Sequence, residues 1–183
     1  MSESERQVLL DARGAERVLA RMAREVVEQV VDLERLVLVG VHRRGVQLAR
    51  WLAEEIERAE GQPIPTGSLD ITLYRDDLMQ IGPRPVVGQT QLPTGGIDGK
   101  TLVIVDDVLY TGRTIRAALD ELADFGRPRR ILLCVLADRG GRELPIHADI
   151  VGKRVQVREG DRVEVLVPEI DGRRGVELVK GAR

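Results

Sequence analysis

The sequence predicts an α/β fold, in which a central and mostly parallel β-sheet is flanked by helices. Short runs of consecutive apolar residues alternate along the chain with longer segments whose apolar residues recur every three or four positions. Continuous apolar runs are typical of parallel strands buried on both faces, and the longer segments are typical of the covering helices. With 183 residues, 43% of them apolar, the chain is long enough for one domain, residues 1–183, with a substantial core.

The first half of the chain supplies two predicted helices and two predicted strands. An apolar stripe with a spacing of four residues predicts a helix over 14–31, and residues 45–59 repeat this helical pattern. Between them, 35–40 is a short apolar run that ends at a glycine and predicts a strand. Residues 68–74 alternate between apolar and polar and predict another strand. The glycine- and proline-rich residues 75–98 are expected to form a long irregular loop, which in a compact domain is usually functional or mobile.

The second half continues the alternation. Residues 100–105 and 129–137 are apolar runs that predict buried strands, and 112–126 is a helical segment that ends at a glycine. Residues 138–157 are rich in loop-forming residues, 161–167 resemble a strand, and the final GVELVK could form one more. Ligands of parallel α/β folds bind beyond the carboxyl ends of the strands. The polar loops that follow the apolar strands are therefore expected to meet around one crevice.

The motif VIVDDVLYTGRT carries two kinds of ligand-binding group at one of these strand ends. Asp106 and Asp107 are acceptors when ionised, suited to vicinal hydroxyls or to Mg²⁺. Thr111, Gly112 and Thr114 stand where a strand becomes a helix, and the unpaired N–H groups and dipole of a helix start favour a phosphate. Paired acids can also simply end a strand, and a threonine can simply cap a helix. The whole motif nevertheless points to a ribose 5-phosphate.

Composition limits the other classes of function. The net charge of −2 gives no global attraction to nucleic acid, so any such contact needs a local patch. Cys134 is the single cysteine, which excludes a disulfide framework and a cysteine-based metal site. No apolar run approaches the roughly 20 residues of a membrane span, and the polar N-terminus does not resemble a signal peptide. A cytoplasmic protein without a membrane partner is expected.

The motif VIVDDVLYTGRT resembles the phosphoribosyl-diphosphate (PRPP) motif of the type I phosphoribosyltransferases. Together with DITLYRDD (70–77) and LADRGGRELPIHADIVGK (136–153), it is similar to the PyrR family, whose members regulate pyrimidine operons and are also uracil phosphoribosyltransferases. A purine-salvage relative would usually carry an aspartate at the position of Tyr110. The resemblance implies the type I phosphoribosyltransferase fold, with a hood at about 138–160 plus the N-terminal segment and a flexible lid at about 74–91.

The resemblance also implies roles for individual residues. The predicted catalytic residues are Asp106, Asp107 and Arg43. The residues expected against PRPP and its 5-phosphate are Val108, Leu109, Tyr110, Thr111, Gly112, Arg113 and Thr114. Those expected against the leaving diphosphate are Val41, His42, Arg43, Arg44 and Arg84, although Arg43 and Arg44 could also form a plain exposed turn. Those expected near uracil are Tyr110, Asp138 and Arg139. Mg²⁺ is the expected cofactor, bound through PRPP with Asp106 and Asp107 as candidate ligands. Relatives often have a cis non-proline peptide near residues 41–42, which a sequence does not reveal.

Tyr110 is not expected to accept a proton, because the pKa of an unperturbed tyrosine is about 10. We expect it to pack near the base or to position it. The reaction implied is uracil plus PRPP giving UMP and diphosphate. A purine-salvage enzyme without RNA binding is one alternative, and a nucleotide-sensing regulator that has lost catalysis is another.

A second implied function is binding to a stem-loop of pyrimidine-operon leader mRNA, promoted by uridine nucleotides such as UMP and UTP. Arginines spaced four, four and three apart would form one stripe on the first predicted helix, beginning at Arg13. The residues predicted to contact RNA are Arg17, Arg21, Arg24, Lys153 and Arg154. A solvated helix face paired with Glu16, Glu25 and Glu28 is the simpler alternative for the helix. The resemblance further implies a homodimer or homotetramer.

Overall fold

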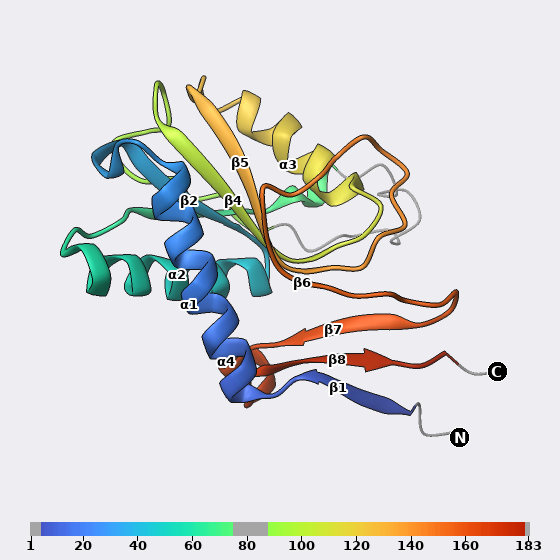
Figure 1. Ribbon diagram of the computed structural model, residues 1–183. Helices are drawn as coiled ribbons and strands as arrows, with labels where there is room; N and C mark the ends of the chain where they lie inside the picture. Colours follow the sequence, from blue (N-terminus) through green and yellow to red (C-terminus); the bar gives the residue numbers. More distant parts are fainter. Residues whose placement is uncertain (1–4, 75–87, 182–183) are drawn as a thin grey trace.

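The computed structural model describes residues 5–74 and 88–181. These residues form two β-sheets with helices packed on them, as Figure 1 shows. The larger sheet has five strands in the order β3-β2-β4-β5-β6, and the smaller has three in the order β1-β8-β7. The larger sheet is parallel throughout and the smaller is antiparallel, so the predicted α/β class is confirmed.

The parallel sheet brings the carboxyl ends of its strands to one edge. Its strands are β2 (Leu36–Val41), β3 (Thr66–Leu69), β4 (Thr101–Leu109), β5 (Arg130–Asp138) and β6 (Ile150–Arg154). The central strand β4 continues beyond the predicted end at residue 105, because its pairing with β5 extends to Leu109 and Asp138. Asp106 and Asp107 consequently lie inside the last part of a strand, where the sheet fixes their backbone.

Helices cover both faces of this sheet. The helices α1 (Ala12–Gln29) and α2 (Arg44–Glu60) pack on one face, and α3 (Arg113–Ala123) packs on the other. Neighbouring strand residues point to opposite faces, so Leu38 is buried against α1 and α2 while Val39 is buried on the side of α3. Among the described residues, no helix has the length and apolar character that crossing a membrane requires.

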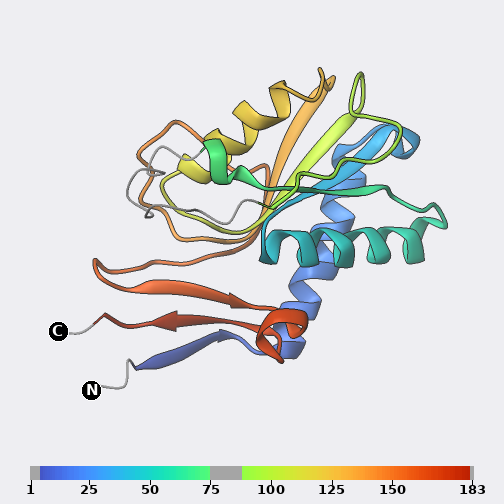
Figure 2. The same cartoon turned by 180° about the vertical axis from the view of Figure 1, so that it is seen from behind.

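The small sheet stands apart from the large one and contains both ends of the described chain (Figure 2). It consists of β1 (Arg6–Leu10), β7 (Arg162–Leu166) and β8 (Gly175–Val179). The one-turn helix α4 (Pro168–Asp171) connects β7 to β8. Val165 and Val176 are buried in the same core as α1 and α2, so the small sheet is anchored to the large one by apolar contact.

The predicted strand over 68–74 is wrong beyond Leu69. There β3 ends, and Ile71–Tyr74 form a 3-10 turn. The cause is local, because the Asp70 carboxylate accepts hydrogen bonds from the backbone N–H of Thr72 at 2.9 Å and from its hydroxyl. An aspartate that binds the backbone two residues later turns the chain and competes with strand pairing.

The residues predicted as a hood are divided between the two sheets. Within 138–160, the strand β6 pairs with β5 and belongs to the large sheet. The N-terminal segment, by contrast, forms β1 of the small sheet and pairs with β8. The unit that stands opposite the carboxyl edge of the large sheet is therefore made of β1, β7, α4 and β8.

Candidate active site

A cavity of about 680 Å³ lies at the carboxyl edge of the large sheet, which is within the usual size range of small-molecule sites. The segments that follow β2 and β3, the end of β4 and the first turn of α3 all line it. Its lining residues are Val41, His42, Arg43, Asp70, Ile71, Thr72, Gly88, Asp106, Asp107, Val108 and Thr114. The structure thus brings together the predicted diphosphate loop, both predicted acids and part of the predicted phosphate turn.

The loop between β2 and α2 is compressed against its neighbours. A Cβ atom on Gly45 would lie 2.5 Å from the carbonyl oxygen of Val105, so only glycine allows α2 to start this close to β4. The His42–Arg43 peptide bond is cis, and the N–H of His42 donates to the carbonyl of Leu69 at 2.9 Å. Arg43 is exposed and lines the cavity.

The two acids have different environments although they are adjacent. Asp106 is 6% exposed, whereas Asp107 is more open and also lines a second cavity toward the small sheet. Asp106 accepts from the N–H of Asp107 at 2.9 Å, and Asp107 accepts from the N–H of Val108 at 2.8 Å. Burial raises the pKa of Asp106 well above its usual range, and the charge of Asp107 adds to this effect.

The predicted phosphate turn leads from β4 into α3. Gly112 precedes α3 with a φ of 92°, a left-handed conformation that favours glycine. Because glycine has no side chain, Gly112 leaves the first N–H groups of α3 uncovered, apart from that of Arg113, which bonds to Thr111. Thr114 lies in this first turn, is exposed and lines the cavity. Thr111 accepts from the N–H of Arg113 at 3.3 Å, which shapes the turn.

Residues 138–149 wrap around the outside of the phosphate turn. The N–H groups of Glu143 and Leu144 donate to the carbonyl of Thr111 at 3.0 and 3.2 Å, and Arg113 forms an ion pair with Glu143. Ile146 packs on the Cα of Gly112, since a Cβ there would lie 3.2 Å from the Ile146 side chain. This wrapping explains how a loop without regular structure stabilises the turn.

The three residues predicted near uracil also lie together. The Arg139 guanidinium stacks over the Tyr110 ring at 3.9 Å from its centroid, and the N–H of Arg139 donates to Leu109 at 3.1 Å. Arg142, which the sequence did not single out for this role, joins the group. It donates to the carbonyl of Tyr110 at 2.8 Å and to Asp138 at 2.7 Å. Arg139 and Tyr110 thus form a cation–π stack just beyond the end of β4, and Arg142 holds the backbone of Tyr110.

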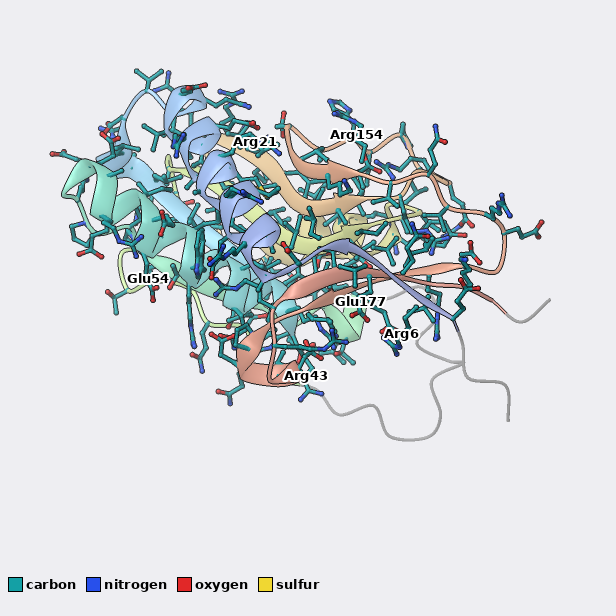
Figure 3. The ribbon with its side chains drawn as sticks, turned by 60° about the horizontal axis from the view of Figure 1, so that its bottom comes forward. Arg6, Arg21, Arg43, Glu54, Arg154 and Glu177 are labelled. Atoms are coloured by element: carbon teal, nitrogen blue, oxygen red, sulfur yellow. The ribbon has the colours of Figure 1, made fainter. Side chains whose placement is uncertain are left out.

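The predicted RNA-contacting residues lie on two adjacent elements, because α1 packs beside β6. The Arg21 guanidinium donates to the carbonyls of Val151 and Gly152 at 3.2 and 2.5 Å, and it pairs with Glu25. Figure 3 shows Arg21 and Arg154 on the same side of the molecule. Arg17, Arg24 and Arg154 are exposed, and Lys153 is half-buried. Arg21 therefore has a structural role that the sequence did not indicate.

Two further residues enter the site without having been predicted. Asp70 lines the main cavity, and Asp171 of α4 binds Arg44 through two hydrogen bonds. Arg44 itself does not line the main cavity but faces the second one. Arg84 and most of the predicted lid at about 74–91 lie outside the described residues.

Comparison with known proteins identifies similar chains. The family model of the Phosphoribosyl transferase domain matches residues 6–168. "Bifunctional protein PyrR" of Thermus aquaticus is 55% identical over 170 residues, 93% of each chain. The protein of the same name from Desulfosudis oleivorans is 54% identical over 173 residues, 94% of this chain and 95% of its own.

Solved structures agree on the fold. The hypoxanthine phosphoribosyltransferase of Trypanosoma cruzi superposes with a TM-score of 0.70 at 17% identity over 98% of each chain. The enzyme of the same name from Staphylococcus aureus gives a TM-score of 0.68 at 18% identity over 96% of this chain and 92% of its own. At such low identity the likeness concerns the fold alone.

Proposed function

Because the chain belongs to the phosphoribosyltransferase family and, within it, to the PyrR proteins, we propose that it has the two functions of that group. The first is transfer of the phosphoribosyl group of PRPP to uracil, which gives UMP and diphosphate. The second is binding to the leader RNA of a pyrimidine operon in response to uridine nucleotides. The observation that supports the transferase function most directly is a single cavity. Its lining includes the two carboxylates, the loop between β2 and α2, and the start of α3.

Each part of the cavity has a task in the proposed transfer. The N–H groups at the start of α3 and the hydroxyl of Thr114 bind the 5-phosphate. Asp106 and Asp107 hold the ribose hydroxyls, since carboxylate oxygens accept the hydrogen bonds that a vicinal diol donates. Arg43 and the N–H groups of the β2–α2 loop bind the diphosphate.

Bond breaking at C1 of the ribose develops positive charge on the sugar and negative charge on the leaving group, as in other glycosyl transfers. The negative charge of Asp107 stabilises the positive charge on the sugar. The guanidinium of Arg43 stabilises the negative charge on the leaving diphosphate, since a preorganised charge is effective where charge develops in the transition state. No strong protein base is required, because the ring N–H of uracil is comparatively acidic.

Mg²⁺ fits the donor set as a metal held jointly by protein and substrate. Carboxylates are the ligands that Mg²⁺ prefers, and it commonly binds through one or two of them together with substrate phosphates. The described residues contain no cluster of three or more potential ligands that would hold an ion alone. We propose Asp106 and Asp107 as its protein contacts, where the ion would neutralise charge on the diphosphate.

Uracil is proposed to bind near the stack of Tyr110 and Arg139, next to the strand end that carries Asp107. The stack offers a flat cationic surface, and Asp138 fixes Arg142 behind it. In this arrangement Tyr110 positions the base and does not move a proton.

The transferase proposal is tested by measuring diphosphate release from PRPP with uracil, hypoxanthine or guanine. Turnover with uracil supports it, and turnover with a purine alone identifies a salvage enzyme instead.

RNA binding is proposed for the surface formed by α1 and β6, with Arg17, Arg24 and Arg154 as phosphate contacts. A gel shift with the leader RNA of the chain's own pyrimidine operon, with and without UMP, tests it. Because phosphate contacts release counterions, affinity must fall between a low and a high salt concentration. Tight UMP binding without turnover would instead identify a regulator that has lost catalysis.

The proposal includes assembly as a homodimer or homotetramer, which light scattering measures directly. Both the substrates and the RNA target are cytoplasmic, so the proposed function also implies a cytoplasmic protein.

A further inference from the structure

One ion pair joins the proposed diphosphate loop to the small sheet. Arg44 is the first residue of α2 and follows directly on the cis peptide and Arg43. Its Nε donates to Oδ2 of Asp171 at 3.1 Å, and its Nη2 donates to Oδ1 at 2.8 Å. Two parallel hydrogen bonds of this kind fix orientation as well as distance. The partners are separated by 127 residues in sequence, so the pair connects two distant parts of the fold.

Asp171 is held firmly on its own side. Its Oδ2 also accepts from the N–H of Val167 at 2.8 Å, and its own N–H donates to the carbonyl of Val167 at 2.7 Å. The carboxylate is therefore part of the α4 turn, between two strands of the small sheet. Its side chain is only 15% exposed, so the ion pair is shielded more than an ordinary surface pair. The hydrogen bond from Arg44 lowers the pKa of Asp171, which keeps it ionised.

Arg44 is also constrained on the side of the large sheet. The following residue, Gly45, is packed against the carbonyl of Val105, which directly precedes Asp106. Arg44 and Asp107 both line a second cavity, of about 440 Å³, whose other lining residues come from the small sheet, α4 and the turn after α4. The ion pair thus spans a gap that borders the reaction site. Figure 3 shows the neighbouring Arg43 on the side of the molecule where α4 lies.

We propose that Arg44 and Asp171 are a positioning pair for the diphosphate group. The pair fixes the β2–α2 loop so that Arg43 and the loop N–H groups face the substrate, and Arg44 itself does not bind the diphosphate. This inference rests on the proposed function, since it concerns how the same site binds PRPP. It replaces the sequence expectation of Arg44 as a direct diphosphate ligand with an indirect role.

The two roles predict opposite effects of freeing Arg44. In Asp171→Asn the ion pair is lost and the guanidinium becomes available. If Arg44 is a direct ligand, the variant should bind PRPP as well as the wild type does, or better. If Arg44 and Asp171 position the loop, the variant should bind PRPP roughly tenfold more weakly, as expected for removal of a coupled contact. UMP lacks the diphosphate, so its affinity should stay within about twofold if only the loop is affected.

The experiment is calorimetric titration of the full chain in Mg²⁺ with PRPP and, separately, with UMP. Asp171→Asn, Arg44→Gln and the double variant are compared with the wild type. We expect weaker PRPP binding in both single variants, no further loss in the double variant, and nearly unchanged UMP binding. Asp171→Glu should recover part of the PRPP affinity, because it retains a carboxylate.

Glu16→Gln is the matched control. Glu16 forms an ion pair of 3.3 Å with Arg174, which is close in sequence to α4. Neither Glu16 nor Arg174 lines the main cavity. The substitution should leave both affinities unchanged. Equal weakening of PRPP and UMP binding in Asp171→Asn would overturn the inference, as would unchanged PRPP affinity. If the wild type binds neither compound, the proposed function fails and the inference fails with it. Normal binding by the wild type with no effect of the variant refutes the inference alone.

Discussion

Replacing Asp106 with asparagine should make the protein more stable. Asp106 is buried, and its carboxylate lies beside that of Asp107, so burial and like charge both raise its pKa. A group whose pKa is raised in the folded state stabilises the fold only while it is protonated. That contribution is present below the pKa of the unfolded chain, about 4, and is lost as the pH rises through the raised value. Asparagine keeps the shape and the acceptor for the N–H of Asp107 without acquiring charge.

The magnitude follows from the cost of ionising a buried carboxyl. Each unit by which a pKa is raised corresponds to about 1.4 kcal/mol at a pH above it. Point substitutions ordinarily change stability by about 0.5–3 kcal/mol, and we expect the gain at a pH above the raised pKa to fall in this range. For a chain of this size, 1 kcal/mol corresponds to roughly 2–4 °C in Tm. Well below pH 4 the wild-type carboxyl is protonated in both the folded and the unfolded state, so the difference should disappear.

Thermal unfolding of both proteins, without Mg²⁺ or ligand, across the range from acid to mildly alkaline pH measures this difference. The control is Glu54→Gln, which changes an exposed carboxylate on α2 and should show no such dependence. A variant that is less stable than the wild type near neutral pH would show that the ionised Asp106 does not destabilise the fold. A gain that does not depend on pH would also refute the reasoning, because the effect would then not arise from ionisation.

Three other substitutions test separate parts of the site. Gly45→Ala would place a Cβ 2.5 Å from the carbonyl of Val105, so we expect a loss of about 1–3 kcal/mol in the free energy of unfolding, measured with denaturant; an unchanged midpoint would contradict this. Tyr110→Phe should keep most of its kcat with uracil, and near-complete loss of turnover with PRPP binding intact would refute the positioning role. Arg154→Glu should weaken binding of the leader RNA roughly tenfold at low salt and less at high salt, measured by gel shift. If the variant binds the RNA as tightly as the wild type at both salt concentrations, Arg154 is not part of the RNA surface.

The core elements could be predicted because their signals are local. A strand buried on both faces must be apolar throughout, and a helix on one face must show a stripe, so β2, β4, β5 and the three long helices are visible in the sequence. The strand β1 could not be predicted in this way. Three of its five residues are exposed, and its pairing partner β8 lies at the other end of the chain. Its existence depends on a contact that no window of sequence contains.

The candidate site shows the same division. Its acids and its phosphate turn lie within one short motif, so their chemistry could be inferred from residue types and order. Asp171 could not, because nothing in PEIDGRRG distinguishes it from any other acid in a turn until the fold places it beside Arg44. Arg21 is a similar case, since its bonds to β6 arise only from the packing of α1 on that strand.

We propose that phosphoribosyl transfer to uracil takes place in the cavity that holds Asp106 and Asp107. Steady-state release of diphosphate from PRPP tests it most directly, with uracil or a purine as acceptor and with Asp107→Asn beside the wild type. We expect turnover that depends on uracil, none with hypoxanthine or guanine, and a loss of roughly a hundredfold or more in kcat/KM in the variant. Faster turnover with a purine than with uracil, or full activity in Asp107→Asn, would contradict the account.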